Sequence, residues 1–323
     1  MRSLYQDAFG DPAEVLKLGD YPQPQPGPGQ VRVRLVMSPI HNHDLMIVSG
    51  KYGYKPPMPH VPGTESLGVV EALGEGVTNL SVGQRVVGGA NTWADSYLVE
   101  AARAIAVPDS IDDETACQMV SMPLSAKMVL HQFGAKAGDW VIQNAGNGAV
   151  AKMVAQFGAE AGINVINLVR RDEGIAELAE AGIQHAVSTA SADWRDKVAE
   201  ITKGAPIGFG IESIGGTATN DLLDVMGENS RLYSFGSLTG APMQISASNL
   251  LFKQQRVEGF WLGRLMQTMS PEITGKLIGE IVTAAATGKL KLAIGGSFGL
   301  DQASAAMTAA VTPGRAGKIV LTP

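Results

Sequence analysis

The stretch that decides the fold is DWVIQNAGNGAVA, residues 139–151. An apolar strand runs into a turn of small residues, and the turn opens a helix. A second apolar stretch, VINLVRR at residues 165–171, ends in a pair of arginines. Strand, tight turn, helix and strand in this order are typical of a dinucleotide-binding βαβ unit. The small residues let the backbone approach a pyrophosphate, whose charge meets the helix N-terminus.

The glycine pattern of this turn is degenerate, because the three usual small positions fall on Ala145, Gly148 and Ala151. Alanine is tolerable at the third position, where the residue packs helix against strand rather than touching phosphate. An ordinary α/β turn is the alternative interpretation. The residues expected to contact the cofactor here are Asn144, Ala145, Gly146, Asn147, Gly148, Ala149 and Val150.

The end of the second strand indicates which dinucleotide is bound. Arg170 lies about 20 residues after Gly148, where an NAD-binding chain carries an acidic residue for the ribose 2′-hydroxyl. Arg170 and Arg171 would instead pair with a 2′-phosphate, which guanidinium groups bind well. Asp172 is acidic, but it lies one position beyond the place where an NAD-binding chain carries its acidic residue. The pattern favours NADPH over NADH, and the alternative is that both arginines are solvated charges at a strand end.

The segments before and after residue 113 differ in their expected secondary structure. Residues 1–112 read as β-rich, since short runs such as 31–36 alternate apolar and basic residues between segments rich in proline and glycine. From residue 113 strand-like and helix-like segments alternate, which predicts a parallel sheet covered on both faces. The expected strands are 140–144, 165–169, 186–188, 208–213 and 231–235, and the expected helices include 173–181, 194–201 and 218–226.

The end of the chain is expected to belong to the same β-rich domain as residues 1–112. A further strand is expected at 257–262, a helix begins at Ser270, and residues 317–321 read as a last strand. We therefore expect an α/β protein in which a Rossmann domain, residues 113–255, is inserted in a discontinuous catalytic domain. That second domain, residues 1–112 and 256–323, is expected to be β-rich and partly barrel-like.

Composition excludes several classes of protein. The chain has 323 residues, 45% of them hydrophobic, and a net charge of −6 without a long basic run, so no nucleic-acid partner is expected. The single cysteine, Cys117, excludes an internal disulfide and a cysteine-rich zinc lobe. No apolar run approaches the length of a membrane span, and the first residues lack the apolar stretch of a secretory signal. A cytoplasmic protein is the expectation.

Several short segments carry a family resemblance. They are SPIHNHD at 38–44, GKYG at 50–53, GTESLG at 63–68, VIQNA at 141–145, INLVR at 166–170 and GFWL at 259–262. With these segments the chain resembles the zinc-independent medium-chain dehydrogenase/reductases over nearly its whole length. Within them it is most similar to the 2-enoyl thioester (enoyl-CoA/ACP) reductases, and next to the quinone oxidoreductases. The resemblance implies a GroES-like catalytic domain beside the Rossmann domain.

The resemblance also implies roles for individual residues. Tyr52 matches the tyrosine that acts as catalytic acid or hydrogen-bond donor in the enoyl reductases, with Tyr54 as a second candidate and simple loop packing as the alternative. Trp261 matches a tryptophan that lines the pocket, and we expect it to be catalytic and to contact the cofactor, although a core tryptophan is the alternative. The other implied cofactor contacts are Asn42, Ser125, Phe235, Gly236, Ser237, Phe260 and Lys318.

No metal site is expected. The zinc-dependent relatives need a cysteine or similar ligand near position 39 to 42 and a histidine directly before Glu65, where this chain has Thr64. His41 and His43 are expected to point to opposite sides of an extended strand, which leaves no compact set of ligands. Asp44 is expected to tie loops together.

The expected function is NADPH-dependent reduction of a carbon–carbon double bond conjugated to a carbonyl. The first expected substrate is a 2-enoyl thioester, and the second is a quinone, a small enone or an aldehyde. The alternative that is not an enzyme is an NADPH-binding sensor or structural protein. Relatives often pair the edge strand near residues 257–262 across a two-fold axis, so a homodimer is expected.

Overall fold

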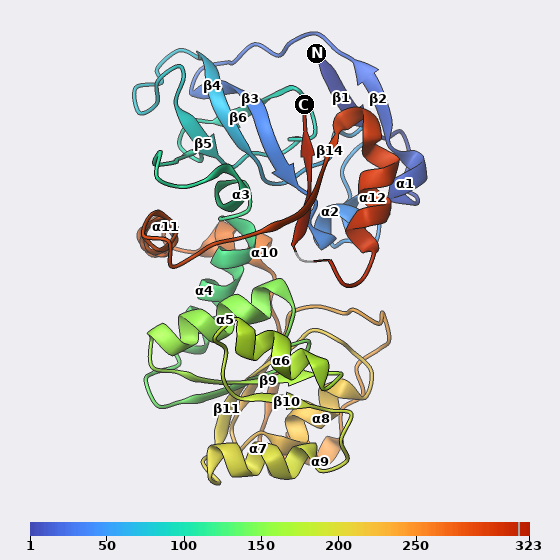
Figure 1. Cartoon of the computed structure of the whole chain (residues 1–323), viewed down its shortest axis with the longest axis vertical. Helices are drawn as coiled ribbons and strands as arrows, with labels where there is room; N and C mark the ends of the chain where they lie inside the picture. Colours follow the sequence, from blue (N-terminus) through green and yellow to red (C-terminus); the bar gives the residue numbers. More distant parts are fainter. Residues whose placement is uncertain (316) are drawn as a thin grey trace. The chain divides into compact units, whose positions relative to one another are not determined.

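The computed structural model describes residues 1–315 and 317–323 and divides them into two compact units. Unit 1 consists of Met1–Ser121 and Ile278–Pro323, and unit 2 of Met122–Leu277. Figure 1 colours the chain along the sequence and shows unit 1 in blue-green and red and unit 2 in green to orange. The expected α/β class, with one unit inserted in another, is confirmed. In the described residues, no helix is both long and apolar enough to cross a bilayer.

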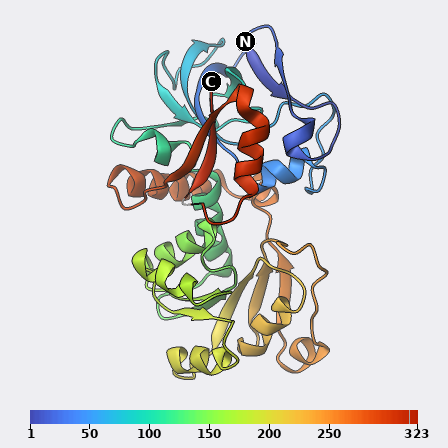
Figure 2. The same cartoon turned by 45° about the vertical axis from the view of Figure 1, so that its right-hand side comes forward.

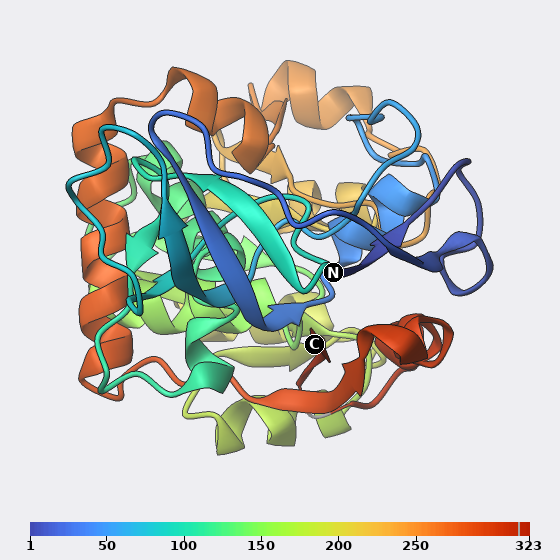
Figure 3. The same cartoon turned by 90° about the horizontal axis from the view of Figure 1, so that it is seen from above.

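Unit 1 is built on a seven-stranded sheet in the order β14-β15-β3-β4-β5-β7, with β6 paired to β3. A separate antiparallel pair joins β1 to β2. The strands are β1 (Arg2–Tyr5), β2 (Lys17–Asp20), β3 (Gln30–Pro39), β4 (Leu67–Leu73), β5 (Arg85–Val87), β6 (Ser96–Glu100), β7 (Ile105–Ala106), β14 (Ile294–Gly299) and β15 (Lys318–Thr322). Figure 3 shows the blue and cyan strands β3 to β5 side by side, as their pairing requires.

The core of unit 1 follows from strand alternation. On β3 every second residue, Val31, Val33 and Leu35, is fully buried, and the arginines between them face outward. A second cluster gathers around Trp93, where β15 and α12 pack together. The helical elements that belong to unit 1 are α1 (Pro12–Val15), α2 (Asn42–Val48), α3 (Asp113–Ala116), the 3-10 turn η1 (Leu300–Gln302) and α12 (Ala303–Val311). Figure 2 shows α12, in red, beside the blue α1.

Unit 2 is a six-stranded, all-parallel sheet in the order β10-β9-β8-β11-β12-β13. Counted along the chain this is 3-2-1-4-5-6, the strand order of a dinucleotide-binding fold. The strands are β8 (Trp140–Gln143), β9 (Asn164–Val169), β10 (Ala186–Ser188), β11 (Ile207–Glu212), β12 (Arg231–Ser234) and β13 (Arg256–Gly259). The order reverses between β8 and β11, so a nucleotide is expected beyond the carboxyl ends of these two strands.

Five helices connect these parallel strands in the described residues: α5 (Ala149–Glu160), α6 (Glu173–Glu180), α7 (Trp194–Thr202), α8 (Ala218–Val225) and α9 (Ala247–Phe252). α4 (Ser121–Phe133) precedes β8, and α10 (Leu262–Thr268) and α11 (Pro271–Ala286) follow β13. α4 begins at the unit boundary, and α11 crosses it. The strands β8, β9 and β11 bury apolar side chains that meet those of α7 and α8 in one cluster around Ile142, Ile166 and Leu222. Burial on both faces explains why β9 is an almost unbroken apolar run.

The unit boundaries differ from the expected ones at 112/113 and 255/256. Residues 113–121 belong to unit 1, and residues 256–277 belong to unit 2. The reason for the second difference is that β13 pairs in parallel with β12 and completes the inserted sheet. The strand expected at 257–262 ends at Gly259, and Leu262 already begins α10. Asp112 caps α3, a single helical turn, by accepting from Thr115 N through its side chain.

Candidate functional site

The turn after β8 has the geometry that a phosphate requires. Ala145 adopts a left-handed conformation with φ 49°, and Gly146 N donates to Leu168 O at 2.8 Å. A Cβ on Gly146 would lie 3.0 Å from Asn167 Cβ and 3.1 Å from Leu168 O, so the turn packs tightly against β9. Gly148 is the N-cap of α5 and offers no side-chain cap. The first N–H groups of this helix therefore remain available to an anion.

A buried polar bridge joins the two central strand ends. Glu212, 0% exposed at the end of β11, accepts hydrogen bonds through Oε1 from Asn144 Nδ2 at 3.1 Å and from Ile214 N and Gly215 N at 2.7 Å each. Asn144 Oδ1 accepts from Ser213 N at 2.8 Å. The bridge crosses the point where the strand order reverses. Glu212 was not predicted as a site residue, although an acidic residue at the end of an apolar strand is a signal that could have identified it.

The two arginines lie directly after β9, at the same edge of the sheet. Arg170 and Arg171 are both exposed. Among the residues that the structure describes, neither guanidinium hydrogen-bonds or ion-pairs with the protein. Both groups are therefore available to a ligand beside the turn after β8.

The remaining candidates of unit 2 follow β12 and β13, apart from Ser125 in α4. Phe235 N and Gly236 N donate to Glu212 O at 2.7 and 3.2 Å, which ties this segment, including Ser237, to the neighbouring strand end. Phe235 stacks on Phe260 with ring centroids 5.1 Å apart. Trp261, 42% exposed, is the N-cap residue of α10 and not a core side chain. Ser125 is buried within α4.

In unit 1 the segment expected to be extended is a helix. His41 precedes α2 as its N-cap, and Asp44, at the third helical position, accepts from His41 N through Oδ2 at 2.9 Å. The expectation that His41 and His43 point to opposite sides is wrong, because their imidazoles stack with centroids 5.0 Å apart and planes 16° apart. Residues two positions apart share one side of an extended backbone, and His41 retains extended dihedral angles. Asn42 lies exposed at the start of the helix.

Two hydrogen-bonded chains run from these histidines. His41 Nε2 lies 2.7 Å from Glu65 Oε2, both side chains being buried, and Glu65 Oε1 accepts from Val120 N at 2.6 Å. His43 Nε2 lies 2.7 Å from Thr64 Oγ1, and the Thr64 hydroxyl donates to Asp44 Oδ1 at 2.7 Å. Asp44 thus joins α2 to the 63–66 loop, as expected.

Tyr52 and Lys318 lie near these chains. Tyr52 follows α2, its backbone N–H donates to Met46 O at 3.1 Å, and its ring centroid lies 6.0 Å from that of His43. Lys318 begins β15. Burial lowers the pKa of Lys318, Arg315 adds to this effect, and Asp44 and Glu65 oppose it. The structure thus gathers Tyr52, Lys318 and the histidine chains in unit 1, and the turn, arginines and Phe235–Trp261 candidates in unit 2.

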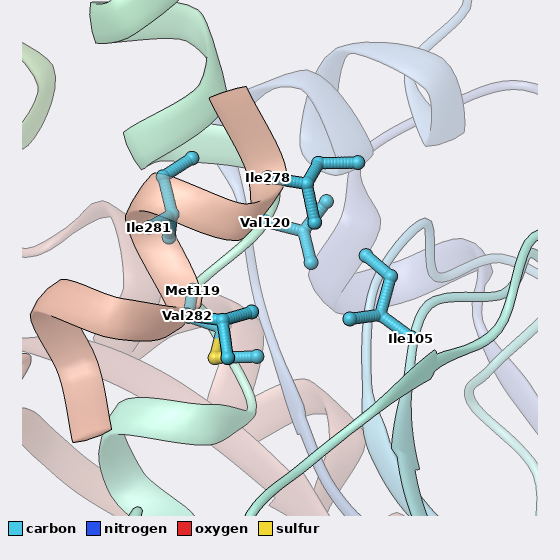
Figure 4. Close-up of a pocket in the computed structure, with 6 residues that line it drawn as sticks. All are labelled: Ile105, Met119, Val120, Ile278, Ile281 and Val282. Carbon is cyan, nitrogen blue, oxygen red and sulfur yellow. The ribbon is translucent and has the colours of Figure 1, made fainter. Parts of the chain in front are cut away.

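The described residues of unit 1 contain no cluster suited to a metal ion, and one small apolar hollow lies in this unit. Within the described ranges, no group of three His, Cys, Asp or Glu side chains is placed to hold a metal ion. One partly open hollow of unit 1 has about 10 Å³, which is about the smallest volume that admits a water molecule. Its lining is wholly apolar and consists of Ile105, Met119, Val120, Ile278, Ile281 and Val282 (Figure 4). A hollow of this size cannot hold an acyl chain.

Comparison with known proteins agrees with this architecture. The family model "Alcohol dehydrogenase GroES-like domain" matches residues 27–109, and the model "Zinc-binding dehydrogenase" matches residues 149–278. The human protein named mitochondrial enoyl-[acyl-carrier-protein] reductase is 28% identical over 331 aligned positions, covering 100% of this chain and 88% of the relative.

Solved structures superpose along the whole chain. A candidate NADPH:quinone reductase from Bacillus thuringiensis is 26% identical with a TM-score of 0.93, covering 100% of this chain and 98% of its own. A mycobacterial protein solved in complex with NADPH is 26% identical with a TM-score of 0.87, covering 100% of both chains. From these domain matches and full-length similarities, the chain belongs to the medium-chain dehydrogenase/reductase family of oxidoreductases.

Proposed function

We propose that this protein uses NADPH to reduce a carbon–carbon double bond conjugated to a carbonyl, and that its substrate is a 2-enoyl thioester. The observation that carries the proposal is the position of Tyr52, a phenol at the end of α2 whose ring lies 6.0 Å from that of His43. Similarity to the human enoyl-[acyl-carrier-protein] reductase supports the substrate class.

The residues of unit 2 fit the cofactor. The turn at Gly146 packs tightly against β9, and the N-terminus of α5, which has no side-chain cap, opens beyond it toward a pyrophosphate. Arg170 and Arg171 would hold the 2′-phosphate, and the segments at 235–237 and 260–261 would border the ribose and nicotinamide. Bound there, NADPH supplies the hydride. The mycobacterial relative solved with NADPH supports this choice of cofactor.

The residues of unit 1 would supply the proton. As the double bond is reduced, negative charge grows on the carbonyl oxygen, and a proton must reach the α-carbon. The Tyr52 phenol can donate a hydrogen bond to that oxygen or a proton to that carbon. We infer that Asn42, Lys318 and Trp261 contact the bound cofactor and that Trp261 also takes part in catalysis.

The decisive experiment follows the loss of NADPH absorbance with a short 2-enoyl-CoA and, in parallel, with a simple quinone. Wild type is compared with Tyr52→Phe and with Tyr54→Phe, whose side chain is 51% exposed. We expect enoyl-CoA turnover that falls about a hundredfold or more in Tyr52→Phe and persists in Tyr54→Phe. The opposite pattern in the two variants would transfer the role to Tyr54.

The second candidate function is quinone reduction, which the TM-score of 0.93 to the Bacillus thuringiensis protein favours. Turnover of the quinone alone, unchanged in Tyr52→Phe, would establish it and return Tyr52 to a packing role. NADPH binding without turnover of either substrate would favour a sensor or structural protein. A cytoplasmic location stays a prediction, since the human relative is named as a mitochondrial enzyme.

We further propose that the chain forms a homodimer through the edge of the unit 2 sheet. β13 is the last strand of that sheet, and the α9 residues just before it, Leu250, Leu251 and Phe252, are 40, 62 and 80% exposed. An unpaired strand edge beside exposed apolar side chains is protected when a second copy covers it. Sedimentation should give a dimer that Phe252→Asp weakens, and a monomeric wild type would contradict the proposal.

A further inference from the structure

Three side chains of unit 1 form a continuous chain from a buried carboxylate to an imidazole. The Asp44 side chain is fully buried and accepts from His41 N through Oδ2 and from the Thr64 hydroxyl through Oδ1. The same Thr64 oxygen lies 2.7 Å from His43 Nε2. This arrangement links α2 to the 63–66 loop and ends at the ring that faces Tyr52.

The hydrogen count along this chain determines the tautomer of His43. A threonine hydroxyl has one hydrogen, and Thr64 donates it to Asp44. The Thr64 oxygen can then only accept from His43, so His43 Nε2 carries a hydrogen. In the neutral imidazole, Nδ1 is therefore the nitrogen with the free lone pair. The negative charge of Asp44, bridged to the ring by the Thr64 hydroxyl, also stabilises protonated His43 when that form arises.

His43 and Tyr52 are held by the same helix. His43 lies in the first turn of α2, and the Tyr52 N–H bonds to Met46 O near its end. Their rings are 6.0 Å apart between centroids and tilted by 35°. The His43 side chain is 24% exposed, so solvent can exchange protons with it. His41, stacked on the same ring, is 0% exposed and cannot.

We propose that Asp44 and Thr64 are positioning residues that hold His43 with Nδ1 open, so that His43 passes protons from solvent to Tyr52. This inference rests on the proposed function. The phenol O–H bond breaks as the new C–H bond forms at the α-carbon. Neutral His43 takes one proton from water at Nδ1, and that N–H bond breaks as the Tyr52 oxygen regains its proton. The electron pair for the reduced bond comes with the hydride of NADPH, so one solvent proton is consumed per double bond.

The charges around His43 suit a transient carrier. Burial lowers the pKa of His43 below its ordinary value of 6.5, and the neighbouring His41 and Lys318 act in the same direction, while Asp44 and Glu65 oppose it. The ring is therefore neutral at neutral pH and releases a proton readily once it has taken one. A histidine with a raised pKa would hold that proton instead.

The first test needs no cofactor or turnover. In cofactor-free protein, long-range ¹H–¹⁵N spectra of the imidazoles should show His43 with hydrogen on Nε2 and none on Nδ1 in wild type and in Thr64→Ser. Thr64→Val removes the hydroxyl and should give a mixture of tautomers. Wild-type His43 with its hydrogen on Nδ1 would overturn the proposal, whatever the substrate of the enzyme.

The second test uses chemical rescue. His43→Ala should lower kcat by about ten- to a hundredfold with KM changed by no more than about twofold, and should enlarge the solvent deuterium effect on kcat. Added imidazole should restore part of kcat in His43→Ala and none in Tyr52→Phe. The control, His131→Ala, removes an exposed imidazole near the end of α4 and should behave as wild type.

The two proposals can fail separately. If wild type reduces no conjugated carbonyl, the proposed function is refuted. The tautomer measurement would still show which nitrogen of His43 carries hydrogen. Turnover that depends on Tyr52, together with unchanged kcat in His43→Ala or no response to imidazole, would overturn the role of His43 alone.

Discussion

Replacing Glu212 tests the buried bridge at the centre of the unit 2 sheet. Its Oε1 atom accepts three hydrogen bonds, from the Asn144 side chain and from the backbone of Ile214 and Gly215. Glu212→Leu fills the same space without an acceptor, so these three donors lose their partner. Glu212→Gln keeps an amide oxygen that can occupy the Oε1 position.

The expected magnitudes follow from the cost of unpaired buried groups. A buried donor without a partner costs about 1 to 3 kcal/mol. Because water can reach part of the half-buried loop, the lower end applies, and three donors give a loss of about 3 kcal/mol for Glu212→Leu. Glu212→Gln should lose about 1 kcal/mol, since its new N–H₂ replaces Oε2, a buried atom that has no hydrogen-bond partner within the described residues.

The assay is urea unfolding of wild type and both variants, together with titration of NADPH binding. Asn144 and the 213–216 loop lie where the cofactor is proposed to bind, so Glu212→Leu should also weaken NADPH affinity in the folded protein. A free energy of unfolding within about 1 kcal/mol of wild type for Glu212→Leu, or equal losses in the two variants, would refute the reasoning.

Three further predictions use the same measurements. Replacing Arg170 and Arg171 together by alanine should weaken NADPH binding about ten- to a hundredfold and leave NADH binding unchanged, since only the 2′-phosphate is lost. Gly74→Ala should destabilise the fold by about 3 kcal/mol, because its Cβ would lie 1.9 Å from a carbonyl oxygen, whereas Gly279→Ala, with nothing within 4 Å in the interior of α11, should stabilise it by about 0.5 to 1 kcal/mol. Burial lowers the pKa of Lys318 below its ordinary value of 10.5. The charged amine therefore reduces the free energy of unfolding at neutral pH, and this penalty disappears as the pH rises from the lowered pKa to 10.5. Lys318→Met should therefore be the more stable protein at neutral pH, and its advantage should shrink in alkaline urea titrations.

The Rossmann strands could be predicted because their signal is local. Each expected strand from 140–144 to 231–235 overlaps its counterpart, since a doubly buried parallel strand is an apolar run between turns. The unit boundaries could not be predicted in the same way. Whether residues 256–259 complete one sheet or start another depends on pairing with β12, which no local pattern encodes.

The same distinction applies to the candidate site. The turn at 144–150 and the arginines at 170 and 171 are contiguous in sequence and were identified. Glu212 acts through Asn144, 68 positions earlier, and His43 through Thr64, 21 positions later. Such bridges depend on which strand ends and loops the fold brings together. Residue type and position could mark Glu212 as a buried acid at a strand end, but they could not identify its hydrogen-bond partners Asn144, Ile214 and Gly215.

The segment at 41–44 was predicted to be an extended strand, but a helix begins there at Asn42. Residues two positions apart lie on the same side of an extended backbone, so an extended segment would also have placed His41 and His43 on one face. The sequence did contain the contrary signal, an aspartate three positions after the cap residue, where a carboxylate can accept from the cap N–H. With the helix beginning at Asn42, Asp44 is drawn inward, Thr64 donates to it, and the tautomer of His43 follows from the hydrogen count. An Asp44→Ala variant should therefore disturb the His43 imidazole spectrum as strongly as Thr64→Val, although Asp44 does not itself hydrogen-bond that ring.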